Sequence, residues 1–179
     1  MAIMRPVSLD EAVEVREQEE NMTGRFRAER DRLRLGLATA SLKFEHVGST
    51  AVPGLAGRPV VDLMLGASPP VWATLEELRA RVVALGYEDL GEAGVPGRIL
   101  FRRRTPLRAF NVSLVEENGP LWRDGLALRD HLRAHPDAAA AYAASKRAAI
   151  AGGARTTPAY AEAKAPALAA LLKTARGGR

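Results

Sequence analysis

The feature that most constrains the fold is residues 46–62, where a loop rich in small residues joins two stretches of strand character. Residues 44–47 favour a short strand, and residues 48–57 hold three glycines and one proline, a composition typical of a loop. Residues 59–65 are mostly apolar, which predicts a second, buried strand. That strand nevertheless contains Asp62, and a carboxylate is costly to bury without a metal, a cation or hydrogen-bond donors. The segment therefore predicts a polar site beside two strands.

The turn at Gly48 offers groups that bind anions. Gly48 has no side chain, so a ligand can approach the backbone closely, and the amides that follow can form a nest or a helix N-terminus for phosphate oxygens. Ser49 and Thr50 add hydroxyl donors at the same place. Because side chains alternate along a strand, Asp62 points away from its two apolar neighbours. We expect Asp62 to face the same cleft as the Gly48 turn.

The remaining pattern predicts an α/β (α+β) protein, a small mixed β-sheet flanked by helices with a helical C-terminal part. We expect one domain, 1–179, made of an N-terminal helix within 1–40, a sheet core over 41–118 and C-terminal helices over 119–175. Ser8 is the expected cap of the first helix, and Gly24 marks an expected break. The other expected elements are a helix over 69–85, antiparallel strands over 99–103 and 108–115, and helices over 121–135, 136–151 and 157–175.

The composition excludes several classes of site. The chain has no cysteine, which removes disulfides, thiolate metal sites and a cysteine nucleophile, and only three histidines, so a multi-histidine zinc site would need all of them or carboxylates. The net charge of +5 suits a phosphate-bearing small molecule or nucleotide. No signal peptide, membrane span or nucleic-acid motif is apparent, so we expect a cytoplasmic protein, with nucleic acid an unlikely partner. The sequence leaves the oligomeric state open.

The segment 46–62 resembles the signature of the GrpB family, a branch of the nucleotidyltransferase superfamily. Later motifs extend the resemblance over roughly residues 40–172: the block 128–133, His135-Pro136, Tyr142 with Lys146, and Tyr160 with Lys164. The resemblance implies a nucleotidyltransferase-like fold in which a Gly-Ser turn holds the triphosphate of ATP or another nucleoside triphosphate. It also implies that Asp62 is the first carboxylate that holds Mg²⁺.

Two departures from the superfamily pattern bear on the metal. The superfamily has a second acid two residues after the first, where this chain has Met64, and a third acid on a neighbouring strand, where Asn111 and Ser113 are the candidates. Many members of the GrpB family have a His-x-His pair at those last two positions. A two-metal site needs roughly three or four carboxylate oxygens. A single-metal or metal-free site is therefore an alternative to the two-metal site of the standard reaction.

Further candidates surround this segment. His46 suits general-base catalysis or a phosphate contact, or it is a hydrogen-bonded residue that fixes the loop. Asn111 and Ser113 share one strand face and line a pocket or an exposed surface. Cations that could bind a phosphate or carboxylate, each with a structural alternative, are Arg58, Arg102, Arg104 and Lys146.

Three functions remain open from the sequence. The first is an enzyme that binds a nucleoside triphosphate and transfers a nucleotidyl group to a small acceptor or activates it. The second is the same fold used on another small anionic substrate, in biosynthesis or antibiotic modification. The third is a non-catalytic binding module, which the arginine-rich strand over 98–108 favours.

Overall fold

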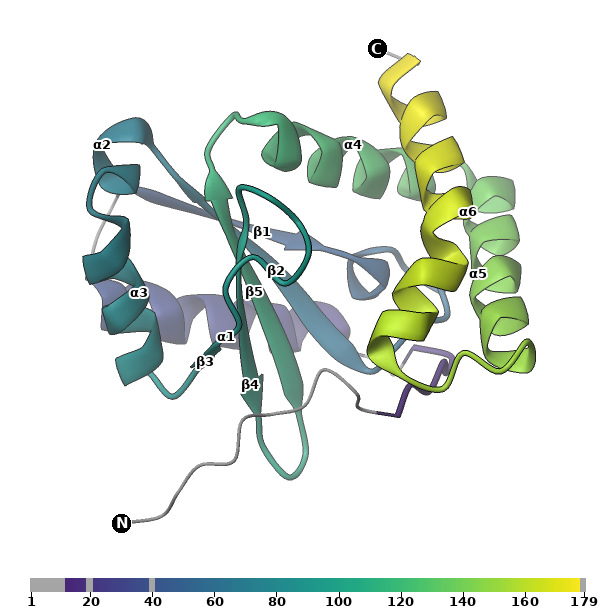
Figure 1. The fold of residues 1–179 in the computed structure, drawn as a ribbon, viewed down its shortest axis with the longest axis horizontal. Coiled ribbons are helices and arrows are strands. Elements are labelled where there is room, and N and C mark those ends of the chain that lie inside the picture. The colour runs from purple at the N-terminus through teal and green to yellow at the C-terminus, as the bar shows by residue number, and fades with distance from the viewer. Residues whose placement is uncertain (1–11, 19–20, 39–40, 178–179) are drawn as a thin grey trace.

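The computed structural model describes residues 12–18, 21–38 and 41–177, and Figure 1 shows the arrangement of their elements. In chain order these are α1 Met22–Leu37, β1 Leu42–Val47, the 3-10 helix η1 Ser49–Ala51, β2 Val60–Ala67, α2 Pro69–Trp72, α3 Leu75–Ala84, β3 Glu88–Asp89, β4 Ile99–Arg104, β5 Ala109–Glu116, α4 Pro120–Ala134, α5 Pro136–Ala151 and α6 Thr157–Gly177.

The strands form one mixed sheet in the order β1-β2-β5-β4-β3. β2 and β5 are parallel, and the other neighbouring pairs are antiparallel. Asp62 on β2 lies opposite Val47 on β1 and Asn111 on β5, and Asn111 lies opposite Arg102 on β4. Paired residues on neighbouring strands point to the same face of a sheet. The register therefore places Val47, Asp62, Asn111 and Arg102 in one row across one face.

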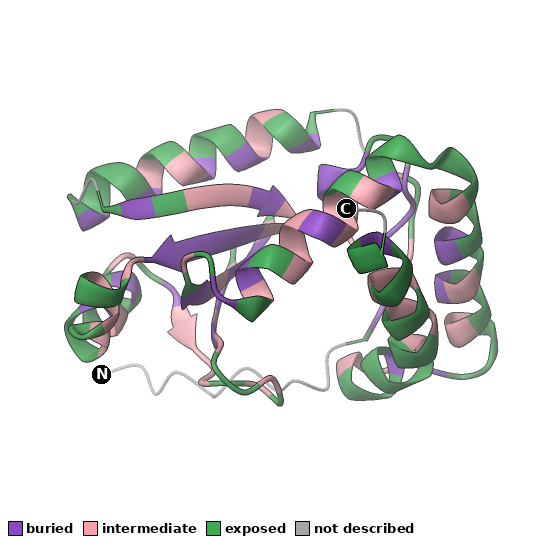
Figure 2. Ribbon diagram, turned by 90° about the horizontal axis from the view of Figure 1, so that it is seen from above, coloured by how far each residue is buried: buried purple, intermediate pink, exposed green. Residues whose placement is uncertain are grey.

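Helices α1 and α3 cover the face opposite that row. Residues 22, 26, 29, 33 and 37 of α1 are buried, which is the spacing of one helical stripe. Leu33 and Leu37 are completely buried against strand residues such as Leu63 and Phe110. Figure 2 shows α1 running along this side of the sheet, its buried positions turned inward. This layer is the main hydrophobic core.

Helix α4 covers the second face, which carries the Asp62 row. Trp122 of α4 packs on Met64 and Val115 of the sheet. Gly66 makes that contact possible, because a Cβ there would lie 2.5 Å from Cζ3 of Trp122. Helices α5 and α6 contact α4 and each other, beyond the sheet (Figure 1). The second face is therefore only partly covered by α4.

The predicted fold class, a small mixed sheet flanked by helices, is confirmed. The antiparallel pair β4 and β5 and the three C-terminal helices also lie where the sequence predicts them. The expected helix over 69–85 is divided into α2 and α3, and the two-residue strand β3 was not expected.

The predicted N-terminal helix is wrong for residues 12–18. Ala12 and Arg16 form antiparallel bridges with Thr156 and Gly57, so this stretch is extended and exchanges backbone hydrogen bonds with distant parts of the chain. Gly24 lies inside an unbroken α1, and the predicted cap Ser8 lies outside the described residues.

Candidate functional site

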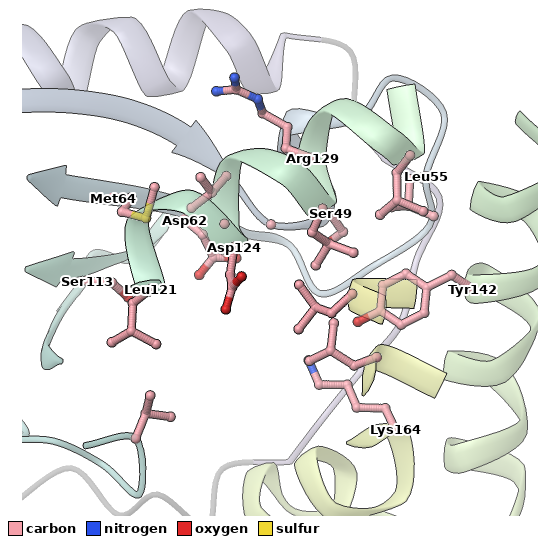
Figure 3. A pocket seen from close by; sticks show the side chains of 18 of the residues that line it. Ser49, Leu55, Asp62, Met64, Ser113, Leu121, Asp124, Arg129, Tyr142 and Lys164 are labelled. Atoms are coloured by element: carbon pink, nitrogen blue, oxygen red, sulfur yellow. The ribbon is translucent and has the colours of Figure 1, made fainter. Parts of the chain in front are cut away.

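A cavity of about 340 Å³ lies between the second face of the sheet, the Gly48 turn and helices α4, α5 and α6. Figure 3 shows Asp62 and Asp124 pointing into it from the sheet and α4, and Lys164 reaching into it from α6. The charged and hydroxyl-bearing residues that line it are Ser49, Arg58, Asp62, Arg98, Ser113, Asp124, Arg129, Tyr142, Lys146, Tyr160 and Lys164. Much of the remaining wall is aliphatic, including Leu168 and Leu172 of α6. The cavity thus combines a charged region with an apolar one.

The Gly48 turn and Asp62 touch each other, as the sequence predicts. Gly48 has φ 71°, in the left-handed region that favours glycine. A Cβ on Gly48 would lie 2.5 Å from Oδ2 of Asp62, so any larger residue would collide with the carboxylate. Gly57 closes the loop in the same way, because its Cβ would lie 2.1 Å from Oγ of Ser49. Both glycines are needed for the loop to fold down beside Asp62.

Asp62 is held in place by its neighbour in the sheet. Nδ2 of Asn111 donates a hydrogen bond of 2.9 Å to Oδ1 of Asp62. Asn111 is buried, with 5% of its surface exposed, and it does not line the cavity. Ser113, two residues further along β5, does line the cavity. Asn111 therefore orients the carboxylate, and Ser113 adds a hydroxyl to the wall.

Two lysines approach the cavity from the C-terminal helices. Nζ of Lys146 donates a hydrogen bond to the carbonyl oxygen of Ala56 and lies 4.7 Å from the ring centre of Tyr142. Nζ of Lys164 lies 5.2 Å from the ring centre of Tyr160. Burial, with a contribution from Lys164, lowers the pKa of Lys146 to about 8. Burial likewise lowers the pKa of Lys164. The negative charge around the two amines is therefore too small to offset the cost of burying them.

Two arginines complete the cationic wall. Nη1 of Arg58 donates a hydrogen bond of 3.4 Å to Oγ1 of Thr157. Nη2 of Arg98 donates hydrogen bonds of 3.2 Å to the carbonyl oxygens of Glu92 and Ala93. Arg98 precedes β4 at the end of a tight loop, and burial lowers the pKa of its guanidinium. Within residues 12–18, 21–38 and 41–177, no carboxylate forms a salt bridge with either arginine.

His46 and Thr50 lie outside the cavity. Val47 faces the cavity beside Asp62, so His46, its neighbour on β1, points to the opposite face. Its ring stacks on Phe26 of α1 at 4.6 Å, and its Nε2 lies 3.0 Å from Oγ1 of Thr50. Burial, followed by the charges of Arg133 and Arg129, lowers the pKa of His46 to about 4. This is the geometry of a histidine that fixes the loop, and it gives no support to a general base.

Two predicted cation sites are also separate from the cavity. Arg102 is buried in the row beside Asn111, and Arg104 is exposed nearer the β4–β5 hairpin; neither lines the cavity. Arg129 borders the cavity, but Figure 3 shows its side chain directed away. It forms salt bridges of 2.6 Å with Glu45 and 2.7 Å with Asp130.

Sequence reasoning missed two charged residues of the cavity. Asp124 comes from α4 and forms a bidentate pair with Arg176 of α6, at 2.8 and 2.5 Å. The sequence gives Arg98 no role beyond its place in the arginine-rich stretch 98–108. Neither has a local signal, because their places depend on how α4 and the loop before β4 pack over the sheet.

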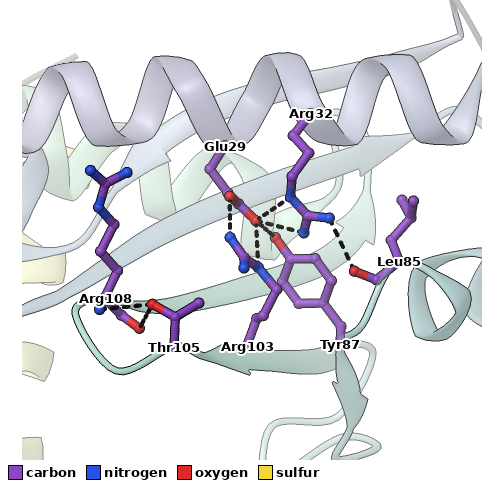
Figure 4. A network of polar contacts seen from close by, with 7 residues as sticks. All are labelled: Glu29, Arg32, Leu85, Tyr87, Arg103, Thr105 and Arg108. Atoms are coloured by element: carbon purple, nitrogen blue, oxygen red, sulfur yellow. Dashed lines mark hydrogen bonds and ion pairs between the residues drawn. The ribbon is translucent and has the colours of Figure 1, made fainter.

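A second polar cluster, the Glu29 cluster, lies on the opposite face of the sheet (Figure 4). Glu29 of α1 is 3% exposed and accepts hydrogen bonds from Arg32, Tyr87 and Arg103, those from Arg103 measuring 3.0 and 2.5 Å. Burial alone would raise the pKa of Glu29, but these hydrogen bonds hold it below the usual value. The cluster ties α1 to β4 and leaves neither Glu29 oxygen without a donor.

The family of this chain follows from comparison with known proteins. The family model described as "GrpB protein" matches residues 12–174, so the chain belongs to the GrpB family. The UPF0157 protein YqkA of Bacillus subtilis is 31% identical over 122 residues, which cover 68% of this chain and 35% of that protein. The chain therefore spans about a third of the length of this relative.

Solved structures also resemble the chain. The crystal structure of conserved protein GrpB from Enterococcus faecalis has a TM-score of 0.74 and 26% identity, and the match covers 90% of this chain and 98% of that one. The Cid1 poly(U) polymerase has a TM-score of 0.48 and 18% identity, over 69% of this chain and 40% of that one, a likeness too low to inform on activity. Among the described residues, no helix is long and apolar enough to cross a membrane.

Proposed function

We propose that this chain is a nucleotidyltransferase-like enzyme that binds a nucleoside triphosphate in the cavity and transfers a nucleotidyl group to a small acceptor or activates it. The observation that carries the proposal is the contact between the Gly48 turn and Asp62. Gly48 and Ser49 of the turn and the carboxylate of Asp62 line the same cavity. The turn suits a phosphate, and the carboxylate suits proton transfer. The resemblance of residues 46–62 to the nucleotidyltransferase pattern supports the same assignment.

The residues of the cavity divide into binding and reacting groups. The Ser49 hydroxyl and the charges of Arg58, Lys146 and Lys164 suit phosphate oxygens, because charge-assisted hydrogen bonds are the strong ones. Asp62, oriented by Asn111, is the group able to accept the proton of an attacking acceptor. The aliphatic residues Leu168 and Leu172 of α6 suit an apolar part of the ligand beside these charges.

Magnesium is the cofactor that the resemblance implies, and the donor atoms here do not fit a pair of such ions. Within the described ranges, no group of three or more His, Cys, Asp or Glu side chains could hold a metal ion. Asp62 already accepts a hydrogen bond from Asn111, and Asp124 is paired with Arg176. Met64 packs beneath α4, where a Cβ on Gly125 would lie 3.0 Å from its Sδ. The roles above are therefore assigned to side chains alone.

A second candidate function is the same fold acting on another small anionic substrate, in biosynthesis or antibiotic modification. The excess of cations over free carboxylates in the cavity favours it, because this arrangement selects for negative charge without requiring a nucleotide.

The proposed function is tested by thermal shift with ATP, CTP, GTP and UTP, with and without MgCl₂, followed by pyrophosphate release with candidate acceptors. We expect at least one nucleotide to raise the melting temperature at millimolar concentration. The Asp62→Asn variant should fold normally and lose turnover. The control Asp130→Asn, on the exposed side of α4, should fold and keep turnover. Failure of all four nucleotides to stabilise the chain, or full activity of Asp62→Asn, would contradict the proposal.

A further inference from the structure

The cavity holds more positive than negative charge. Arg58, Arg98, Lys146 and Lys164 line it, and none of them forms a salt bridge with a carboxylate in the described part of the chain. Two carboxylates line it, and one of these, Asp124, is already paired with Arg176. Buried or half-buried cations without counter-ions are costly to a folded protein. An arrangement of this kind is stable when an anionic ligand supplies the missing charge.

Arg98 is the member of this set that most needs a ligand. Its Nε is buried and has no hydrogen-bond partner, while Nη2 reaches only two carbonyl oxygens of its own loop. A lysine in such a place can lose its proton, but a guanidinium stays charged at any physiological pH. Asp62 is close enough to act on the Arg98 charge, although the two form no salt bridge. Arg98 is thus a permanent cation beside the proposed reacting acid.

The loop that carries Arg98 is built to hold it still. Leu90 and Leu100 close its base through backbone hydrogen bonds of 2.8 Å, from Leu90 N to Leu100 O and from Leu100 N to Gly91 O. The amide of Gly97 donates a further bond of 2.8 Å to Oε1 of Glu92. Because the loop is already ordered, a ligand that meets Arg98 loses little conformational entropy in fixing it.

We propose that Arg98 is a substrate-binding residue that receives a multivalent phosphate group of the ligand, and that side-chain cations balance this charge without a divalent metal ion. Arg98 would act from the side of β4, opposite Lys146 and Lys164 on the helices. The identity of the ligand as a nucleotide rests on the function proposed above, whereas the binding of a polyphosphate to Arg98 does not.

The proposal is tested by calorimetric titration of the full chain with inorganic pyrophosphate and with ATP, each in EDTA and in MgCl₂. We expect wild-type protein to bind in EDTA, and Arg98→Gln to bind about tenfold or more weakly, the loss expected for a hydrogen-bonded charge. Arg98→Lys should recover part of that affinity. The matched control is Arg108→Gln, an exposed arginine of the β4–β5 hairpin at the far end of β4, which should bind as wild type does.

Asp62→Asn gives a test that does not depend on the folding of an Arg98 variant. If side chains balance the phosphate charge, removing the Asp62 carboxylate strengthens binding in EDTA, because a repelling charge is lost. If a metal ion balances it, the same change abolishes the binding seen in MgCl₂. Binding that requires MgCl₂ and is equal in Arg98→Gln and Arg108→Gln would overturn the inference and leave the proposed function intact. Binding of pyrophosphate through Arg98, but of no nucleotide, would support the inference and overturn the proposed function; no binding of either would overturn both.

Discussion

The two faces of the sheet differ in whether their charged side chains are paired within the protein. On the α1 side, the carboxylate of Glu29 is surrounded by donors from Arg32, Tyr87 and Arg103, and the cluster is closed. On the α4 side, cations such as Arg98 and Lys146 face a cavity with no carboxylate bound to them in the described ranges. Charges that satisfy one another stabilise a fold, whereas charges that face an open space are available to a ligand. The difference separates the structural cluster from the candidate site.

The largest effect on stability is expected from breaking the Glu29 cluster. Glu29→Ala should lower the free energy of unfolding by about 3–5 kcal/mol, because it leaves the partly buried Arg32 and Arg103 without their counter-ion and the buried Tyr87 hydroxyl without its acceptor. Urea denaturation followed by circular dichroism measures this. Glu76→Ala is the control, since its carboxylate pairs with Arg79 but its side chain is 82% exposed, and the change should be small. A loss at Glu29 no greater than at Glu76 would contradict the distinction between the faces.

The next effect concerns His46, which lies on the α1 side of the sheet, as the Glu29 cluster does. Its folded-state pKa of about 4 is below the ordinary 6.5, so the unfolded chain binds a proton that the folded chain excludes. Stability should therefore fall as the pH drops from 6.5 towards 4, by on the order of 3 kcal/mol in total. Urea unfolding at several pH values would show this slope. His46→Gln should flatten it, and the exposed His135→Gln should not; equal slopes in the two variants would refute the assignment.

A smaller effect on stability is expected at Gly48, compared with Gly54 in the same loop. Gly48 and Gly54 both have positive φ, but a Cβ at Gly54 would meet nothing within 4 Å. Both Gly→Ala changes should cost about 1–2 kcal/mol of backbone strain. Gly48→Ala should cost about 1–3 kcal/mol more, because the new Cβ displaces Asp62. Thermal unfolding of both variants compares them, and equal losses would mean that the contact with Asp62 is unimportant.

The smallest effect on stability is expected at the centre of the open site. Asp62→Asn should change the free energy of unfolding by less than about 0.5 kcal/mol, because the new amide oxygen can still accept the hydrogen bond from Asn111. Chemical denaturation of this variant beside Glu29→Ala would give the sharpest contrast between the two faces. A loss at Asp62 comparable to that at Glu29 would show that the acid is structural.

The sequence predicts the parts of this molecule that are local. The strands around Gly48, the placement of Asp62 on one strand face and the positions of the C-terminal helices follow from patterns a few residues long. The sequence leaves two roles open for His46, because the choice depends on the pairing register, which turns Val47 and not His46 towards Asp62. Glu29 had an unused signal, since it occupies a buried position in the helical stripe of α1.

Other parts depend on packing over long distances in the chain. Residues 12–18 contain enough charge and regular spacing to suggest a helix, yet their backbone pairs with Gly57 and Thr156. Arg98 and Asp124 enter the cavity only because a loop and a helix distant in sequence fold over the same face. No pattern of neighbouring residues could have revealed that arrangement.

The extended stretch 12–18 has a practical consequence for anyone who shortens this protein. Its Arg16 exchanges two backbone hydrogen bonds of 2.9 Å with Gly57, and the Gln18 side chain donates to the carbonyl oxygen of Leu55 at 2.7 Å. A truncated version that begins at α1 would keep every strand of the sheet. It would also remove the outer support of the loop that shapes the cavity, so we expect such a fragment to keep the sheet but to bind a ligand of the cavity less tightly.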